Sequence, residues 1–382
     1  MLMEEKILVI QKIIEQESKT STYKFALLRA VIDLISAQSP FIEVGQRVVK
    51  IPVTLISDKW LFYYWDLIES GFTQIRGDRK LAFEGRIQSL KSDNDFLNYW
   101  DFNKALHRNN YITQHKELFS STIKELNNTI IKNPVRYLGS SSRNGDYSFF
   151  QIEKNEGKKR KVEGFVDLIE NSPKICFDLA YYDVFKHYGG FISGSNSIIL
   201  NWIAFMNKKT STNDESIVSE PMTSYGNDRL LSIMIQEQVA EREVKEIRDF
   251  WVTKIRLGIP VFCAWSGKQI KEVSELAIDH AIPFSVMFNN DYWNLLPCLS
   301  KVNGNKSDKI LSIDQIQLAK ERILDIWESY KNEPKLSQTF QAHCQISLTG
   351  TSAINDFSNL LDKFTSLNGF FIDSRGMESW NC

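Results

Sequence analysis

The sequence has few cysteines, and nothing in their spacing ties them together. Five of the 382 residues are cysteine, and no two of them form a CxxC pair. An odd, scattered set of cysteines argues against a disulfide framework and against a zinc site built from four thiolates. We therefore expect a protein of a reducing compartment.

Long hydrophobic runs are also missing. The longest one, SIILNWIAFM at 197–206, is too short to span a bilayer and includes Asn201. The first 19 residues are amphipathic and interrupted by charges, unlike a signal peptide. These features predict a cytoplasmic protein with no membrane partner.

The chain has almost no excess of charge of either sign. Its formal net charge is -1, so no overall attraction to a polyanion exists and any nucleic-acid site must be local. A hydrophobic content of 43% with 24% charged residues is ordinary for a globular protein. A chain of 382 residues is long enough for two or three compact units.

The N-terminal part, residues 1–78, combines helical periodicity with one strand-like segment. Two helices are expected near 4–17 and after 22, followed by the strand GQRVVKIPV and the helix LISDKWLFYYWDLI. Two interpretations carry about equal weight. One is a winged-helix-like domain, and the other is a simple helical packing module.

The middle part, residues 79–226, is expected to be helical with one β-hairpin. The segments DYSFFQIEK and KVEGFVDLI alternate as strands do around the turn NEGKKRK. The tip of this turn is basic, which would suit contact with a DNA backbone, although a charged tip also keeps a turn soluble. The four basic residues are Lys158, Lys159, Arg160 and Lys161. A long helix is then expected from 228 to 256.

The stretch 262–308 carries the clearest chemistry. Asp279 and His280 lie where a strand is expected to end, Asn294 follows a loop, and Asn303 precedes Lys306 by three residues. Hydrolysis of a phosphodiester needs a cation that stabilises charge on oxygen, a base that activates water, and a group that holds the base still. Asp279 offers an oxygen ligand for a hard cation, and the imidazole of His280 can accept a proton at neutral pH.

Two asparagine side chains and one lysine side chain complete this set of candidate site residues. Asn294 would hold the imidazole or brace the loop by hydrogen bonding. Asn303 would supply a second oxygen ligand, and Lys306 would meet the phosphate. Asn305 is a rival to Asn303 as ligand, but only Asn303 leaves Lys306 in register.

This arrangement resembles the HNH nucleases, which carry a ββα-metal hairpin and helix. The resemblance rests on CAWSGKQI, IDHAIPFS, DYWNLLP and KVNGNKSDK. It implies that Asp279 and Asn303 bind Mg²⁺ or Mn²⁺, that His280 is the general base, and that Asn294 orients it. Together with TYKFALLRAVIDL, these segments are similar to a bacterial group of restriction or defence-type HNH endonucleases of comparable length.

One departure from that family concerns zinc. Many HNH proteins hold a structural zinc with two CxxC pairs, and the four corresponding positions here are Cys263, Ser266, Leu299 and Val302. We therefore expect no structural zinc. Packing must hold the hairpin instead, through Trp265, Ile282, Phe284, Trp293 and Leu296.

These inferences predict an α+β chain that is mostly helical, with an HNH nuclease domain in its C-terminal half. The expected divisions are 1–78, 79–226, 227–332 with the nuclease domain, and a C-terminal tail at 333–382. In that tail QTFQAHCQISL is a candidate strand.

The predicted function is metal-dependent hydrolysis of DNA in restriction or anti-phage defence. The enzyme would act as a homodimer, by successive nicks, or with partner subunits of a defence system. The alternative is a catalytically silent subunit that binds nucleic acid or partner proteins.

Overall fold

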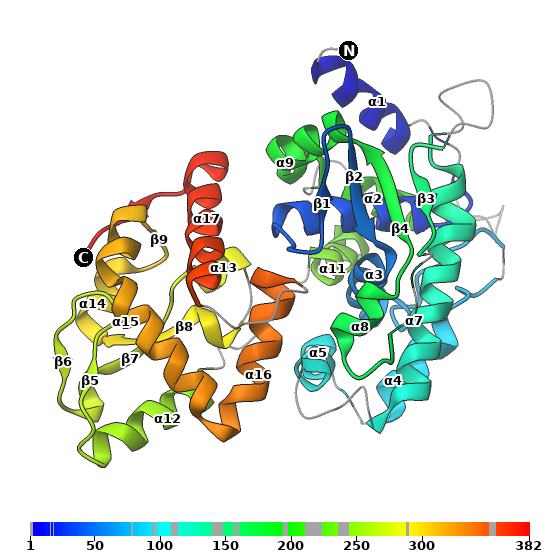
Figure 1. Ribbon diagram of the computed structural model, residues 1–382. Coiled ribbons are helices and arrows are strands. Elements are labelled where there is room, and N and C mark those ends of the chain that lie inside the picture. The colour runs from blue at the N-terminus through cyan, green and yellow to red at the C-terminus, as the bar shows by residue number, and fades with distance from the viewer. Residues whose placement is uncertain are drawn as a thin grey trace. The chain divides into compact units, whose positions relative to one another are not determined.

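The computed structural model divides the chain into two compact units, residues 1–237 and 238–382 (Figure 1). The residues that the structure describes are 3–15, 17, 19–77, 79–93, 96, 98–107, 114–139, 148–155, 157, 160–193, 198–210, 224–235, 244–287, 290–350 and 357–382. Each unit combines many helices with small sheets, so the predicted α+β, mostly helical class is confirmed. Among the described residues, no helix has both the length and the apolar character needed to cross a membrane.

The N-terminal unit is a set of helices with one small sheet. Its helices are α1 (Met3–Glu15), α2 (Tyr23–Ser36), α3 (Val53–Leu67), α4 (Glu84–Asp93), α5 (Tyr99–His107), α7 (Lys116–Ile130), the π-helix η1 (Ile131–Val135), α8 (Phe165–Glu170), α9 (Leu179–Ser193), α10 (Ile198–Thr210) and α11 (Ser224–Ile235). Its strands are β1 (Glu43–Val44), β2 (Val48–Pro52), β3 (Gln151–Glu153) and β4 (Lys174–Asp178).

The sheet of this unit joins segments that are far apart in sequence. Its strand order is β1-β2-β4-β3, and all three pairings are antiparallel (Figure 1). Ile51 of β2 lies opposite Ile175 of β4, and both are fully buried. Strand β2 therefore completes a sheet with residues well beyond position 78, and the winged-helix interpretation of 1–78 stays a prediction.

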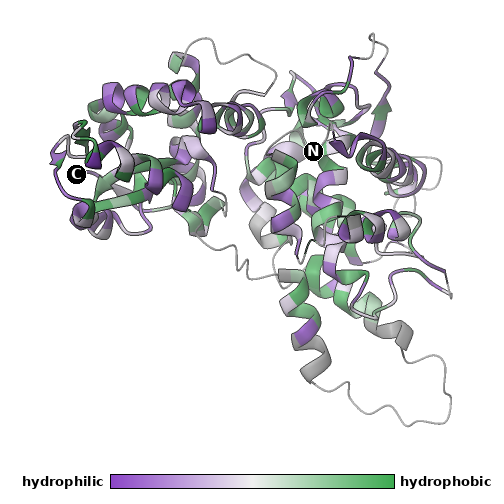
Figure 2. Ribbon diagram, turned by 90° about the horizontal axis from the view of Figure 1, so that it is seen from below, coloured by the Kyte–Doolittle hydropathy of each residue, from purple (hydrophilic) through white to green (hydrophobic). Residues whose placement is uncertain are grey.

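Two helices form the centre of the N-terminal unit. Helices α2 and α3 are buried on nearly every side, including Trp60 and Trp65 of α3. A helix that is apolar around its whole circumference must be covered by neighbours on all sides. Figure 2 shows helices that carry both hydrophobic and hydrophilic residues along their length.

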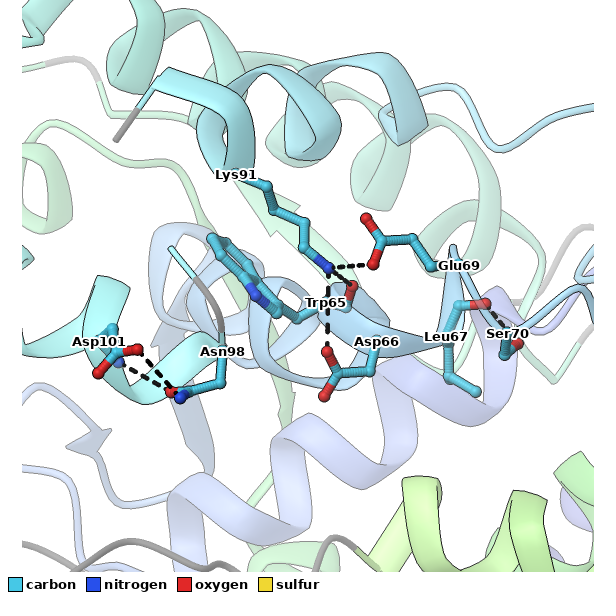
Figure 3. Close-up of polar contacts among 8 residues, drawn as sticks. All are labelled: Trp65, Asp66, Leu67, Glu69, Ser70, Lys91, Asn98 and Asp101. Carbon is cyan, nitrogen blue, oxygen red and sulfur yellow. Dashed lines mark hydrogen bonds and ion pairs between the residues drawn. The ribbon is translucent and has the colours of Figure 1, made fainter. Parts of the chain in front are cut away.

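The C-terminal end of α3 is held by a lysine from α4. Lys91 Nζ donates to the main-chain oxygen of Trp65 at 3.1 Å and to Glu69 Oε2 at 2.7 Å, with Asp66 at 3.9 Å (Figure 3). The last carbonyls of a helix have no partner within the helix, so an ammonium at this place satisfies one of them and suits the helix dipole.

Two predictions for the N-terminal unit were wrong or incomplete. The segment KVEGFVDLI is not a hairpin strand, because Phe165–Glu170 form α8 and the partner of β3 is β4. The helix α8 has only six residues, which is too short for its apolar spacing to distinguish a helix from a strand. The long helix expected at 228–256 is described as two helices, α11 ending at Ile235 and α12 beginning at Lys245, and residues 236–243 lie outside the described ranges.

The C-terminal unit combines helices with two-stranded sheets, which pair β5 with β6, β7 with β8 and β9 with β10. Its helices are α12 (Lys245–Arg256), η3 (Val273–Glu275), α13 (Phe284–Met287), η4 (Tyr292–Asn294), α14 (Ser300–Lys306), α15 (Ile313–Asn332), α16 (Pro334–Cys344), the π-helix η5 (Gln345–Thr349) and α17 (Phe357–Arg375). Its strands are β5 (Val261–Phe262), β6 (Gln269–Ile270), β7 (Leu276–His280), β8 (Leu295–Leu299), β9 (Ile310–Leu311) and β10 (Ser379–Trp380).

One hydrophobic core runs through this unit from Ile247 to Phe371. It includes Leu336 and Phe340 of α16, so the residues after 332 pack into the same core as the residues before it. The candidate strand QTFQAHCQISL is instead helical, in α16 and η5. The four-part division of the chain at 78, 226 and 332 remains a prediction.

Candidate active site

The candidate site lies at the end of a two-stranded hairpin. Strand β7 pairs antiparallel with β8, with Asp279 opposite Leu296 and His280 opposite Leu295. Helix α14 begins at Ser300, directly after β8, and packs against β7 (Figure 1). A strand, a strand and a helix thus follow one another, and they bring the last turn of α14 to the end of β7.

Asp279 is buried and accepts a hydrogen bond on each carboxylate oxygen. Its side chain is 4% exposed. Trp265 Nε1 donates to Oδ2 at 2.7 Å, and Lys306 Nζ lies 3.2 Å from Oδ1. A buried carboxylate needs such partners because the loss of water would otherwise penalise its charge. These contacts fix the position of the carboxylate relative to the turn at 263–267 and to α14.

Lys306 is completely buried at the end of α14. Its ammonium donates to the main-chain oxygen of His280 at 2.8 Å, in addition to its contact with Asp279. The expected contact of Lys306 with phosphate is therefore not the contact seen here. The lysine instead joins α14 to the two residues at the end of β7.

His280 is also buried, but its ring has a partner that the sequence did not indicate. Its Nε2 lies 3.0 Å from Oδ1 of Asn290, and its ring meets Phe284 edge to face at 5.3 Å. Asn290 lies in the run NND that precedes η4. That run of amides and a carboxylate between the Asp-His pair and Asn294 was the available signal, and it was overlooked.

The side chain of Asn294 braces the main chain at Ile282. Its Oδ1 accepts from the N–H of Ile282 at 2.7 Å, and its Nδ2 donates to the carbonyl of Ile282 at 2.9 Å. The main-chain oxygen of Asn294 also accepts from Ala281 at 2.8 Å. Of the two roles considered for Asn294, the geometry favours bracing the loop.

Asn303 lies in α14, half-buried, one helical turn before Lys306. Residues three apart on a helix share a face, so Asn303 and Lys306 are on the side of α14 that faces β7. Asn305, the rival ligand, is exposed. This difference in burial favours Asn303.

The donor set suits a hard divalent cation. Asp279 supplies carboxylate oxygens with remaining lone pairs, and Asn303 supplies an amide oxygen. Mg²⁺ commonly takes one or two protein oxygens and keeps water or phosphate as its other ligands. Among the described residues no three His, Cys, Asp or Glu side chains gather to hold a metal ion.

Hydrogen bonds from α15 hold the turn at 263–267, which includes Cys263 and Ser266. Arg322 donates to the main-chain oxygens of Ala264 at 2.7 Å and Trp265 at 3.2 Å, and Gln315 donates to Trp265 at 3.1 Å. The five residues expected to hold the hairpin by packing are all buried, namely Trp265, Ile282, Phe284, Trp293 and Leu296.

Two cysteines near this turn lie in the protein interior. Cys263 and Cys298 are both fully buried. Burial, with the nearby Asp279 carboxylate as a smaller cause, raises the pKa of Cys298 far above its ordinary value. A thiol that stays protonated is a poor metal ligand and a poor nucleophile.

The basic tip lies outside this site, in the N-terminal unit. Lys158 and Lys159 fall outside the described residues. Arg160 is ion-paired with Glu170, and Lys161 lies 2.8 Å from Glu163. Both described cations therefore have a carboxylate partner within their own unit, and their contact with nucleic acid remains a prediction.

Comparisons with known proteins assign the two parts of the chain to different families. A family described as HNH endonuclease matches residues 263–311, which cover the turn, the hairpin and α14. A family described as a domain of unknown function, DUF8808, matches residues 3–224, more than half of the chain. Neither a curated protein nor a solved structure matches the chain. The chain thus belongs to the DUF8808 family and carries, after that domain, a segment that matches the HNH endonucleases.

Proposed function

We propose that this chain is a divalent-metal-dependent HNH endonuclease that hydrolyses phosphodiester bonds of DNA, in restriction or anti-phage defence. The observation that carries the proposal is the convergence of Asp279, His280 and Lys306 at the end of the β7–β8 hairpin, inside the segment that matches HNH endonucleases. An oxygen ligand for a divalent cation, a base that activates water, and a group that holds them in place are what this hydrolysis requires.

In this proposal the chain's own residues prepare the attack of water on phosphorus. The imidazole of His280 takes a proton from water, and the water oxygen forms a bond to phosphorus as the bond to the 3′-oxygen breaks. The 3′-oxygen leaves with the bonding electrons and takes a proton from solvent, which gives 5′-phosphate and 3′-hydroxyl ends. Asp279 and Asn303 would hold Mg²⁺ or Mn²⁺, which supplies stabilisation of negative charge on the phosphate oxygens when bound. Lys306 and Asn294 keep the end of β7 and the following loop in place.

The other parts of the chain would serve recognition. We propose that the DUF8808 unit, including the basic residues around Arg160 and Lys161, contacts DNA or partner subunits of a defence system. A winged-helix role for residues 1–78 would have to involve β4 as well, because β2 pairs with it. A single HNH site cuts one strand, so a double-strand break implies a homodimer or two successive nicks.

A catalytically silent subunit is the second candidate. It is favoured by one observation, namely that both oxygens of Asp279 already have donors and that its side chain is 4% exposed. The two candidates differ in whether Mg²⁺ or Mn²⁺ binds and supports cleavage. No structural zinc is expected in either, and one zinc per purified chain would contradict that expectation.

A plasmid assay tests the proposal. With Mg²⁺ or Mn²⁺ the wild type should convert supercoiled DNA to nicked or linear DNA, and His280→Ala should cut at least about 10²-fold more slowly, since general bases contribute about 10²- to 10⁴-fold. His187→Ala, which removes an exposed histidine from the other unit, is the matched control and should cut at the wild-type rate. Equal rates for wild type and His280→Ala, or no cutting by the wild type with either metal, would reject the enzyme and favour the silent subunit.

A further inference from the structure

We propose that Asn290 is a positioning residue for His280 and that the C-terminal segment α16–η5 holds it there. The catalytic consequence of this inference rests on the proposed nuclease function, but the positioning itself does not. The segment after residue 332 would then contribute to the geometry of the candidate active site.

The contact between Asn290 and His280 selects one form of the imidazole. A carbonyl oxygen can only accept a hydrogen bond, so His280 Nε2, 3.0 Å from Asn290 Oδ1, carries the proton. Nδ1 then keeps its lone pair, which is the state that a general base needs. The ring of Phe284 stands edge to face with the imidazole at 5.3 Å and limits its rotation.

The side chain of Asn294 binds the main chain, and the asparagine that contacts the imidazole is Asn290. Both polar atoms of the Asn294 side chain bind the main chain of Ile282, two residues beyond His280. The two asparagines therefore have different structural roles. Asn294 shapes the loop that leaves β7, and Asn290 orients the ring.

Asn290 is followed at once by residues that the C-terminal segment binds. Asp291 Oδ2 accepts from Ser347 of η5 at 2.5 Å and from Trp293 Nε1 at 3.0 Å. The N–H of Tyr292 donates to Nδ1 of His343 in α16 at 3.1 Å, and the two rings meet at 5.0 Å. Two successive residues of the loop are thus tied to two positions one helical turn apart in the C-terminal segment.

The far side of the same loop is anchored in the hydrophobic core. Trp327 of α15 donates to the main-chain oxygen of Trp293 at 2.9 Å, and the ring of Trp293 packs on Phe364 of α17 at 6.1 Å. The loop 290–293 is therefore held from α15, α16, η5 and α17. A shift of α16 or η5 would move Asn290 and release the imidazole.

The test uses the full chain labelled with ¹⁵N-histidine, in which five histidines give resolvable ring signals. His280 is assigned by its loss in His280→Ala, and spectra are recorded at a pH well above the ordinary imidazole pKa of about 6.5. The wild type should show the form protonated at Nε2. Asn290→Ala and Ser347→Ala should shift His280 towards a mixture of the two forms, and Asn290→Asp, which keeps an acceptor oxygen, should restore the wild-type spectrum.

Cleavage rates provide the second readout. Asn290→Ala should lower kcat about 10- to 100-fold, as is typical when a residue that orients a site histidine is removed, with KM for DNA unchanged. Asn332→Ala, an exposed asparagine at the end of α15, should change neither readout.

Different results would overturn the positioning role of Asn290 and the proposed nuclease function. A wild-type His280 protonated at Nδ1, or an Asn290→Ala spectrum identical to wild type, would overturn the positioning role whatever the cleavage result. An unchanged kcat in Asn290→Ala with an altered spectrum would overturn its catalytic consequence. A wild type that shows the expected ring form but cuts no DNA would overturn the nuclease and leave the positioning role intact.

Discussion

At the scale of single residues, the end of β7 is set by buried polar groups that satisfy one another. Asp279, Lys306 and Asn294 are at most 3% exposed. Removing one member of such a set leaves another without its partner inside the protein, which costs more than the net gain of the original hydrogen bond. Their substitution should therefore affect stability as well as activity, whereas His280→Ala should act mainly on activity.

Asn294→Ala tests this distinction. The variant leaves the N–H and the carbonyl of Ile282 without their side-chain partners, and we expect the free energy of unfolding of the C-terminal unit to fall by about 2 to 3 kcal/mol. Urea unfolding followed by tryptophan fluorescence measures the change. Asn332→Ala, at an exposed position, should stay within about 0.5 kcal/mol of wild type. Equal stabilities of the two variants would contradict the bracing role of Asn294.

A buried lysine in the N-terminal unit predicts a dependence on pH. Burial lowers the pKa of Lys19 from 10.5 to about 8, although Glu17 opposes the shift. Between pH 8 and 10.5, Lys19 is therefore mostly protonated in the unfolded chain and mostly neutral in the folded chain. Because the unfolded state binds more protons, the free energy of unfolding rises with pH over this window. We expect a rise of about 1 to 2 kcal/mol relative to Lys19→Met, after allowance for solvent screening. Parallel curves of unfolding free energy against pH for the two proteins would show that Lys19 remains charged when folded.

At the scale of elements, helix α15 holds the turn at 263–267 by hydrogen bonds. Its Ser312 caps the N-terminus by accepting from Gln315, and Gln315 and Arg322, two turns apart, both reach the turn at 263–267. Trp265 of that turn then holds Asp279. The position of the candidate acid thus depends on a helix that follows it by more than thirty residues.

Arg322→Ala should therefore loosen the turn and the site together. The variant removes donors to two carbonyls, and we expect a loss of about 1 to 3 kcal/mol in the unfolding free energy and a slower cleavage rate. Glu321→Ala, at the neighbouring exposed position of α15, is the control and should match wild type in both. A stable Arg322→Ala protein with wild-type cleavage would show that Gln315 and the packing of Trp265 hold the turn without Arg322.

At the scale of the whole molecule, the candidate nuclease segment shares its hydrophobic core with the C-terminal helices. Its core includes Leu336, Phe340, Leu360 and Phe364, each at most 2% exposed and all beyond residue 332. Full burial of such side chains contributes about 1.5 to 3 kcal/mol each, which together is comparable with the total stability of a domain. The parallel pair of β9 and β10 adds a further link between the hairpin region and the last residues.

Two fragments test this dependence. Residues 238–382 should unfold cooperatively in urea, whereas residues 227–332, the division expected from the sequence, should show no cooperative transition. Circular dichroism and fluorescence should give coincident curves for the longer fragment. Cooperative unfolding of residues 227–332 would show that the C-terminal helices are an addition to a complete domain.

The sequence by itself determined the segment that carries the chemistry, because residue types in a fixed order along a short hairpin and helix are local information. It also predicted the helices and the strand around α2, β2 and α3, where periodicity extends over a full element. Only the tertiary structure decided which asparagine holds His280, what Lys306 contacts, and that α15 and α16 support the site. Those contacts join residues from 10 to 58 positions apart. A single sequence carries no record of which of these side chains meet once the apolar faces are buried.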